Sequence, residues 1–238
     1  MNFKNKLMMK LKCKTLLFSL VFVTSSKYCN SQTYPDAGMW NTFSLEYELN
    51  SRLSAVLDEE FRLKENFSEI NLFYTNLGMT YKLSRLFKLG LIYRNIQKYQ
   101  IDRTISFRNR LMLDIIVKKK YDPWTFSFRT RFQGEVKDFY TSENGGIPEY
   151  YMRNKFEIKY DLQNRITPYV SAEFRYQIYE RKTPETNGLY HRVRPAIGFD
   201  YKINKKNSFG AYYLIQREWN VNEPEELYII GLQYTLTI

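Results

Sequence analysis

The sequence is poor in the residues that build metal centres, disulfide frameworks and catalytic triads. It contains two cysteines, Cys13 and Cys29, and one histidine, His191, among 238 residues. Two thiols do not make a disulfide scaffold, and a single histidine leaves no His/Cys cluster for zinc. Metal-ligand spacings, a P-loop and a dinucleotide fingerprint are also missing. The sequence therefore predicts no metal, no cofactor and no catalytic residue.

An apolar run long enough to span a bilayer as a helix is missing too, since such a helix needs about 20 apolar residues. The run Thr15–Val23 is shorter, and it follows five lysines within residues 4–14. A positive segment, a short apolar segment and a small-residue site make a secretory signal peptide. We expect cleavage after Ser31, so that residues 1–31 direct Sec-dependent export and residues 32–238 form one mature domain.

Basic residues are in excess, but much of the excess lies in this predicted signal. The chain has 36 Lys and Arg against 25 Asp and Glu, a net charge of +11. Six of the lysines and none of the acids precede residue 32, so the predicted mature domain has 30 basic and 25 acidic residues and a net charge of +5. We therefore predict no nucleic-acid partner.

Aromatic residues are abundant: 21 Tyr, 17 Phe and 3 Trp are too much apolar surface for a disordered chain. Apolar and polar residues alternate along the mature domain. In residues 124–136, for example, Phe126 and Phe128 share one parity, and Arg129 and Arg131 share the other. A period of two predicts a strand with one apolar face and one polar face.

Eleven such runs predict an all-β protein, and their connections alternate between short and longer. This arrangement is typical of an antiparallel up-and-down transmembrane β-barrel with its short turns in the periplasm. Because single-chain bacterial barrels have an even strand number, we expect about 10–12 strands, either ten or twelve. Gln32–Gly38 would then pass through the lumen or pair as a short extra strand, or one run is false. The runs lie near residues 38–49, 52–63, 70–83, 86–98, 103–117, 124–136, 150–162, 166–179, 190–203, 208–219 and 226–238.

Alternation alone does not say which face points inward, because a soluble lipocalin-like periplasmic barrel that binds apolar ligands also alternates. Three features favour apolar faces turned outward to outer-membrane lipid: the long strands, the signal peptide, and aromatic residues near strand ends that would form interfacial girdles. These aromatic residues are Trp40, Tyr81, Tyr93, Trp124, Tyr150, Tyr151, Tyr160, Tyr169 and Trp219.

The last strand, Tyr228–Ile238, carries alternate apolar residues to its final position. It is similar to the C-terminal signal by which outer-membrane barrels are handed to the barrel assembly machinery, although those usually end in an aromatic residue. The predicted location is therefore the outer membrane of a Gram-negative bacterium. The sequence leaves the oligomeric state open.

Charges of both signs lie on the polar faces, where they would line the lumen. They predict either a structural barrel filled with Arg-carboxylate pairs or a narrow, porin-like pore that favours anions. The candidate lumen-lining residues are Glu60, Arg62, Arg94, Arg108, Arg110, Arg129, Arg131, Arg153, Glu173, Arg175, Arg192 and Arg194.

An enzyme is the alternative from a different class. A barrel-embedded hydrolase would place a base at the outer rim, and His191 lies where a predicted strand leaves an outer loop. A base needs a nucleophile or an orienting acid within reach, and no Ser lies beside His191 on the same face. We therefore predict a protein that is not an enzyme.

Several short segments resemble the uncharacterised bacterial family called domain of unknown function 2490. The similarity spans about Asp36 to Ile238. The resemblance implies an outer-membrane barrel and supplies no established reaction or ligand. The segments that carry it are Trp40 followed by Glu46, Glu59–Arg62, Tyr93–Arg94, Arg108–Arg110, Glu173–Tyr176, Arg192–Phe199 and Gly231–Tyr234.

Overall fold

The computed structural model describes residues 34–238 except 101, 103, 143–144, 182–183 and 222–223, so the predicted signal peptide (1–31) lies outside the described residues. The described part holds eleven strands and one turn of 3-10 helix, Pro184–Thr186. None of the helical structure in this part is long and apolar enough to cross a membrane. The strands are β1 (Tyr34–Glu48), β2 (Leu53–Lys64), β3 (Glu69–Lys82), β4 (Phe87–Tyr99), β5 (Ile105–Tyr121), β6 (Trp124–Lys137), β7 (Pro148–Tyr160), β8 (Ile166–Tyr179), β9 (Tyr190–Lys202), β10 (Asn207–Glu218) and β11 (Glu225–Thr237).

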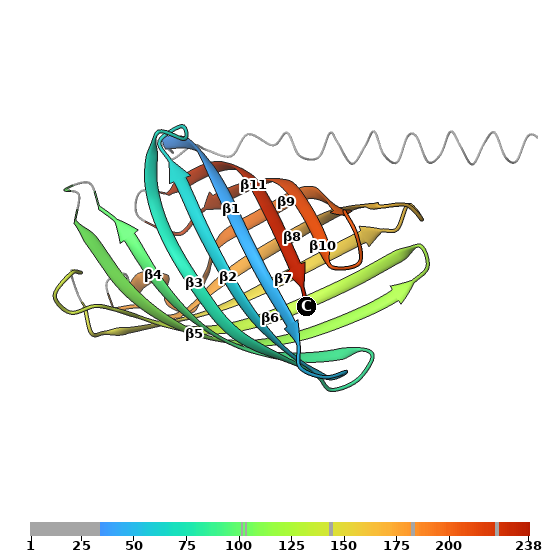
Figure 1. The fold of residues 1–238 in the computed structure, drawn as a ribbon. Helices are drawn as coiled ribbons and strands as arrows, with labels where there is room; N and C mark the ends of the chain where they lie inside the picture. The colour runs from blue at the N-terminus through green and yellow to red at the C-terminus, as the bar shows by residue number, and fades with distance from the viewer. Residues whose placement is uncertain (1–33, 101, 103, 143–144, 182–183, 222–223) are drawn as a thin grey trace, which may run out of the picture. The chain divides into compact units, whose positions relative to one another are not determined.

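The strands form a closed barrel in which β1 lies between β2 and β11 (Figure 1). Sequential neighbours are antiparallel, whereas β1 and β11 pair in parallel, with Trp40 opposite Gly231. The eleven predicted runs are confirmed, and the expected even number is wrong. An odd number of alternating strands leaves the first and last running in the same direction, so a parallel ladder closes the barrel. Residues 34–38, predicted as an extra strand or a lumen segment, are the start of β1.

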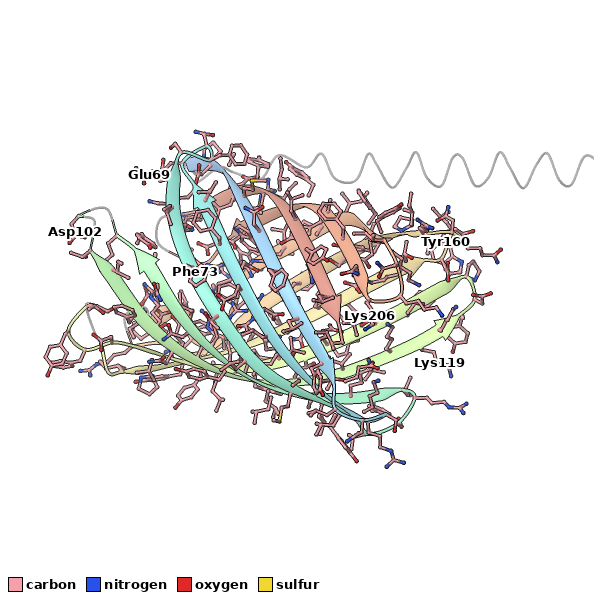
Figure 2. All side chains as sticks on the ribbon, viewed as in Figure 1. Glu69, Phe73, Asp102, Lys119, Tyr160 and Lys206 are labelled. Atoms are coloured by element: carbon pink, nitrogen blue, oxygen red, sulfur yellow. The ribbon has the colours of Figure 1, made fainter. Side chains whose placement is uncertain are left out.

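Connections at the two ends of the barrel differ in length. At the end that holds the C-terminus they are residues 49–52, 83–86, 122–123, 161–165 and 203–206, and we call this the turn end. At the other end, the loop end, they are residues 65–68, 100–104, 138–147, 180–189 and 219–224. In Figure 2, Lys119 and Lys206 mark the turn end, and Glu69 and Asp102 mark the loop end.

The polar parity of the strands faces the interior, and the apolar parity faces outward. Asp114 and Arg131 are buried on neighbouring strands, whereas Leu111 and Met79 are 57% exposed. This orientation is the opposite of the one that a lipocalin-like apolar cavity requires. The large apolar side chains on the outside therefore form a surface suited to contact with a partner other than water.

Some aromatic side chains depart from the predicted girdles. Trp124 and Tyr150 are exposed on the outer face as expected, but Trp40 and Tyr151 are buried inside the barrel. Tyr169 also points inward, since it lies against the inner side of Gly198. These side chains follow the parity of their own strands, and position near a strand end does not override parity.

Glycines make room for tyrosines in the interior. Tyr212 lies opposite Gly198 on β9 and Gly231 on β11. A Cβ atom added at Gly231 would be 1.9 Å from the Tyr212 ring, and one at Gly198 would be 2.9 Å from Tyr169. Aromatic rings packed over strand glycines fill the barrel where a second side chain does not fit.

One polar row interrupts the apolar outer face. The side chains of Glu59, Thr75, Asn95 and Asn109 lie on successive strands β2 to β5 and face one another in register. Within this row Thr75 donates a hydrogen bond to Glu59, at 2.9 Å, and the Asn95 amide donates to Asn109, at 3.0 Å. The row therefore satisfies part of its own hydrogen bonding.

Candidate functional site

The structure places all twelve predicted lumen residues at inward-facing positions. Eight of them line one cavity at the loop end: Arg62, Arg94, Arg108, Arg110, Arg153, Arg175, Arg192 and Arg194. The other four lie outside that lining: Glu60, Arg129, Arg131 and Glu173. Three of these four are buried, namely Glu60, Arg131 and Glu173.

A buried layer crosses the middle of the barrel, and we call it the central layer. Met112 in it is fully buried and Asp114 is 3% exposed. Most side chains of this layer are buried, and Arg129 is partly buried, with its side chain 24% exposed. The central layer consists of Trp40, Glu60, Tyr74, Met112, Asp114, Arg129, Arg131, Glu173 and Ile229.

Glu173 on β8 organises one side of the central layer by accepting hydrogen bonds from three arginines. Its carboxylate lies 2.8 Å from the guanidinium of Arg129, 2.5 Å from that of Arg153 and 3.4 Å from that of Arg194. Arg129 lies on β6, two strands away, which its long side chain spans through the interior. One carboxylate therefore connects four strands, β6 to β9, by charge-assisted hydrogen bonds.

A second ion pair joins β5 and β6. The Nε and Nη2 atoms of Arg131 donate to the two oxygens of Asp114, at 2.6 and 2.7 Å. This bidentate geometry satisfies a planar guanidinium and a carboxylate together. Because both groups are buried, loss of either one would leave an uncompensated charge.

Arginines also stack on aromatic rings of the central layer. The guanidinium of Arg62 lies 3.6 Å from the ring centre of Trp40 and donates to Glu60 at 2.5 Å. The guanidinium of Arg94 lies 3.5 Å from the ring centre of Tyr74. Such stacking stabilises a desolvated cation by about 2 kcal/mol. The inward aromatic residues thus serve as supports for cations.

Above the central layer, toward the loop end, lies a cavity of about 540 Å³, which we call the basic cavity. It reaches the connections 65–68 and 180–189 of that end through Glu65 and Glu180. Its lining holds eleven cationic residues: Arg62, Lys64, Arg94, Lys98, Arg108, Arg110, Lys137, Arg153, Arg175, Arg192 and Arg194. It holds six acidic residues: Asp36, Glu65, Glu135, Glu149, Glu180 and Glu225.

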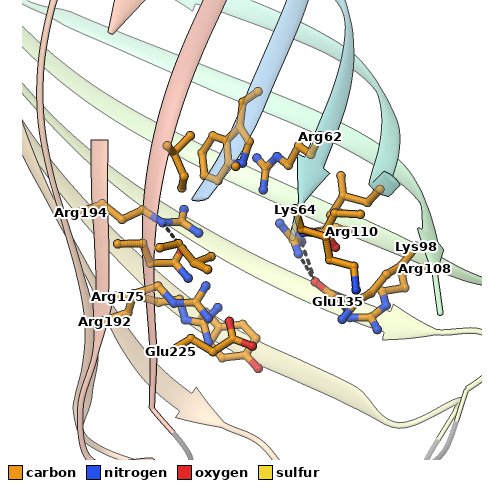
Figure 3. A pocket seen from close by; sticks show the side chains of 18 of the residues that line it. Arg62, Lys64, Lys98, Arg108, Arg110, Glu135, Arg175, Arg192, Arg194 and Glu225 are labelled. Carbon is orange, nitrogen blue, oxygen red and sulfur yellow. Dashed lines mark hydrogen bonds and ion pairs between the residues drawn. The ribbon is translucent and has the colours of Figure 1, made fainter. Parts of the chain in front are cut away.

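The cations approach the basic cavity from two sides. Arg175, Arg192 and Arg194 extend from β8 and β9 on one side, and Lys98, Arg108 and Arg110 extend from β4 and β5 on the other (Figure 3). Cationic walls that face each other concentrate a positive potential in the space between them.

Several of these cations share or lack a carboxylate. Arg108 and Arg110 both pair with Glu135. Arg94 donates to the neutral amide oxygen of Asn76, and Arg175 donates to the ring of His191. Among the described residues, neither Arg94 nor Arg175 has a carboxylate within 4 Å. The cavity therefore carries an excess of positive charge in its wall.

His191 does not lie at an exposed rim, which corrects the position expected from the sequence. It is 1% exposed, and its Nε2 atom accepts a hydrogen bond from Arg175 at 2.6 Å. A register irregularity between β8 and β9 turns this residue inward next to Arg192. Its accepting nitrogen is occupied by a guanidinium, so it is not available as a base. In the described part of the chain, no group of three or more His, Cys, Asp or Glu residues could hold a metal ion.

Sequence reasoning missed several residues of the cavity. Lys64, Lys98 and Lys137 line it, and Tyr151 contributes a buried ring beneath Arg175, 4.5 Å from the guanidinium. Lys98 and Tyr151 share the inward parity of their strands, so the alternation carried a signal for both.

The sequence profile of the family described as "Protein of unknown function (DUF2490)" matches residues 37–226. This match covers most of the barrel, from β1 into β11. No curated protein matches the chain.

Proposed function

The chain belongs to DUF2490, a family of proteins of unknown function, and we propose that it is an outer-membrane β-barrel with a closed lumen. The observation that carries the proposal is the orientation of its faces. Charged side chains fill the interior, and large apolar side chains such as Leu77 and Ile197 cover the outside. A surrounding lipid phase would make such an exterior favourable, which supports the membrane location.

Two further predicted features support the proposed location. The predicted signal peptide supplies export, and the last strand supplies an apolar C-terminus for the assembly machinery. With long connections at one end and tight turns at the other, the loop end would face the outside of the cell and the turn end the periplasm.

Within the membrane, the central layer would make the barrel structural rather than conducting. The buried pair Asp114–Arg131 and the three arginines on Glu173 would block a continuous water path, which supports a closed lumen. No catalysis is part of this proposal, since His191 is buried and bonded to Arg175. A narrow anion-favouring pore is the second candidate, because basic walls favour anions wherever a path exists.

Fractionation and gel mobility test the location. We expect the protein in the outer-membrane fraction, and we expect the unheated sample to migrate faster than the boiled one in mild detergent. A soluble periplasmic protein without this shift would contradict the membrane proposal.

A planar bilayer tests closure. Purified barrel with the central layer intact should give no steady current. A small anion-selective conductance would instead support the second candidate, and a cation-selective current would contradict both.

A further inference from the structure

We propose that the basic cavity is a binding site for a small molecule with at least two oxyanion groups, such as phosphates or carboxylates. This inference goes beyond the proposed function, because it depends on the cavity itself and not on where the barrel resides. It rests on three features: the excess of cations, their arrangement on two walls, and buried polar atoms that lack partners.

The excess of charge is the first feature. Eight of the eleven cations in the lining have a carboxylate within 4 Å, and some of these carboxylates, such as Glu173, lie outside the lining. The other three cations, Arg94, Lys98 and Arg175, have none among the described residues. A buried positive charge without a counter-charge is unfavourable. An anion that enters the cavity removes this penalty, so the unpaired charges of the protein increase its binding affinity.

The two walls are the second feature, and they set the ligand class. Arg175 on β8 and Lys98 on β4 extend toward the cavity from opposite sides (Figure 3). A ligand with anionic groups at two ends would contact both walls, whereas a monovalent anion would contact one. Guanidinium groups bind phosphate and carboxylate oxygens in pairs, and the volume of about 540 Å³ suits a small molecule.

Unpartnered atoms are the third feature. The Nε atom of Arg108 and the side-chain oxygen of Gln133 are buried and have no hydrogen-bond partner among the described residues. Both residues line the basic cavity, and Gln133 is 4% exposed. Buried polar groups nearly always have partners. An oxyanion would accept from Arg108, and a hydroxyl on the same ligand would donate to Gln133.

A soluble anion and a lipid headgroup share this chemistry, and the cavity favours the soluble source. Its lining consists of inward-facing side chains and reaches the loop end near Glu65 and Glu180. A headgroup would have to pass from the outer face over the loop-end rim, whereas a dissolved anion enters directly.

The probe is pyrophosphate, titrated by calorimetry into the detergent-folded barrel. We expect saturable binding that weakens as sodium chloride is raised. The double variant Lys98→Gln/Arg175→Gln should bind at least about tenfold more weakly. Lys205→Gln, in the exposed turn 203–206, is the matched control and should bind as the parent does. Acetate should bind far more weakly than pyrophosphate.

Each other outcome overturns the site. No heat with the parent protein, or equal affinity for the parent and the double variant, would contradict an anion site between these walls. The gel shift of unheated samples shows which variants are folded; if the double variant is not, each single variant replaces it. In a second arm, phosphatidylglycerol vesicles carrying the barrel should leave pyrophosphate affinity at the value found in phosphatidylcholine vesicles. Competition by phosphatidylglycerol would assign the cavity to a headgroup and overturn the soluble ligand.

Discussion

The central layer and the basic cavity are built from the same residue types, yet their charges are balanced differently. In the central layer each carboxylate holds at least one guanidinium, as Asp114 holds Arg131. In the basic cavity Arg94 and Arg175 have neutral partners, and Lys98 has no ion pair within 4 Å among the described residues. The layer is therefore complete without a ligand, and the cavity is not.

This difference separates two uses of buried arginine. A guanidinium that is paired and packed, such as Arg131, holds strands together and closes the lumen. A guanidinium stacked on a ring but left without a carboxylate, such as Arg175 above Tyr151, is positioned in advance for an anion. The residue type is the same in the two cases, so the partner decides which use applies.

The largest loss of stability is expected from a substitution that disrupts packing in the filled part of the barrel. In Gly231→Val, the new side chain meets the Tyr212 ring, since even a Cβ atom would be 1.9 Å from it. We expect a loss of about 3 kcal/mol or more in the free energy of unfolding, measured by urea titration in detergent. Gly210→Ala is the control, because its Cβ would lie 3.4 Å from Asp200 in ordinary contact. Equal stability of the two variants would contradict the packing described here.

Charge balance in the central layer gives the next largest effect. Glu173→Gln removes the carboxylate shared by three arginines and should cost about 3 kcal/mol. The matched control is Glu226→Gln, whose partner Arg217 has a side chain 57% exposed; that pair should be worth about 0–1 kcal/mol. Urea midpoints of the two variants make the comparison. If Glu173→Gln is as mild as Glu226→Gln, the layer is not held by its charges.

Much of this two-part interior follows from alternation, and some of it does not. The alternation of the sequence predicts Arg108 and Arg110 on the polar face of one strand, and it also predicts the eleven strands. The expected even strand number came from other barrels, and no residue of this chain required it. Trp40 shares the even parity of the inward Ser44, so parity was the better guide to that side chain than its position near a strand end.

Pairing between distant strands was out of reach of the sequence. Arg129 on β6 meets Glu173 on β8 because both lie opposite Lys155 on the intervening strand β7, in a register set by the stagger of the strands. Tilt and stagger depend on the closed barrel as a whole. The alternation gives the facing of every charge, but neither which carboxylate each arginine reaches nor which cations stay unpaired.

A substitution at the rim of the basic cavity should destabilise the rim without affecting the central layer. Glu65, Asn66 and Phe67 have φ values of 51°, 54° and 70°, a left-handed run that is unfavourable for non-glycine residues. Asp36 accepts hydrogen bonds from the backbone N–H groups of Glu65 and Asn66, both at 3.0 Å. Asp36→Ala should destabilise this turn by about 1 kcal/mol. Amide exchange should accelerate in residues 65–68 alone; a global change would contradict a local role.

The smallest effect is expected from removing a cation of the basic cavity, and it distinguishes the two regions most directly. Lys98→Gln deletes a charge that has no carboxylate partner among the described residues, in a lining that also holds Arg108 and Lys137. Relief of repulsion offsets the lost contacts, so the free energy of unfolding without ligand should change by about 0.5 kcal/mol or less. Urea titration at low and high salt checks this, because screening should remove any gain. A loss as large as that of Glu173→Gln would mean that the cavity cations, like those of the central layer, are already neutralised within the protein, and an incoming anion would then have no unpaired charge to meet.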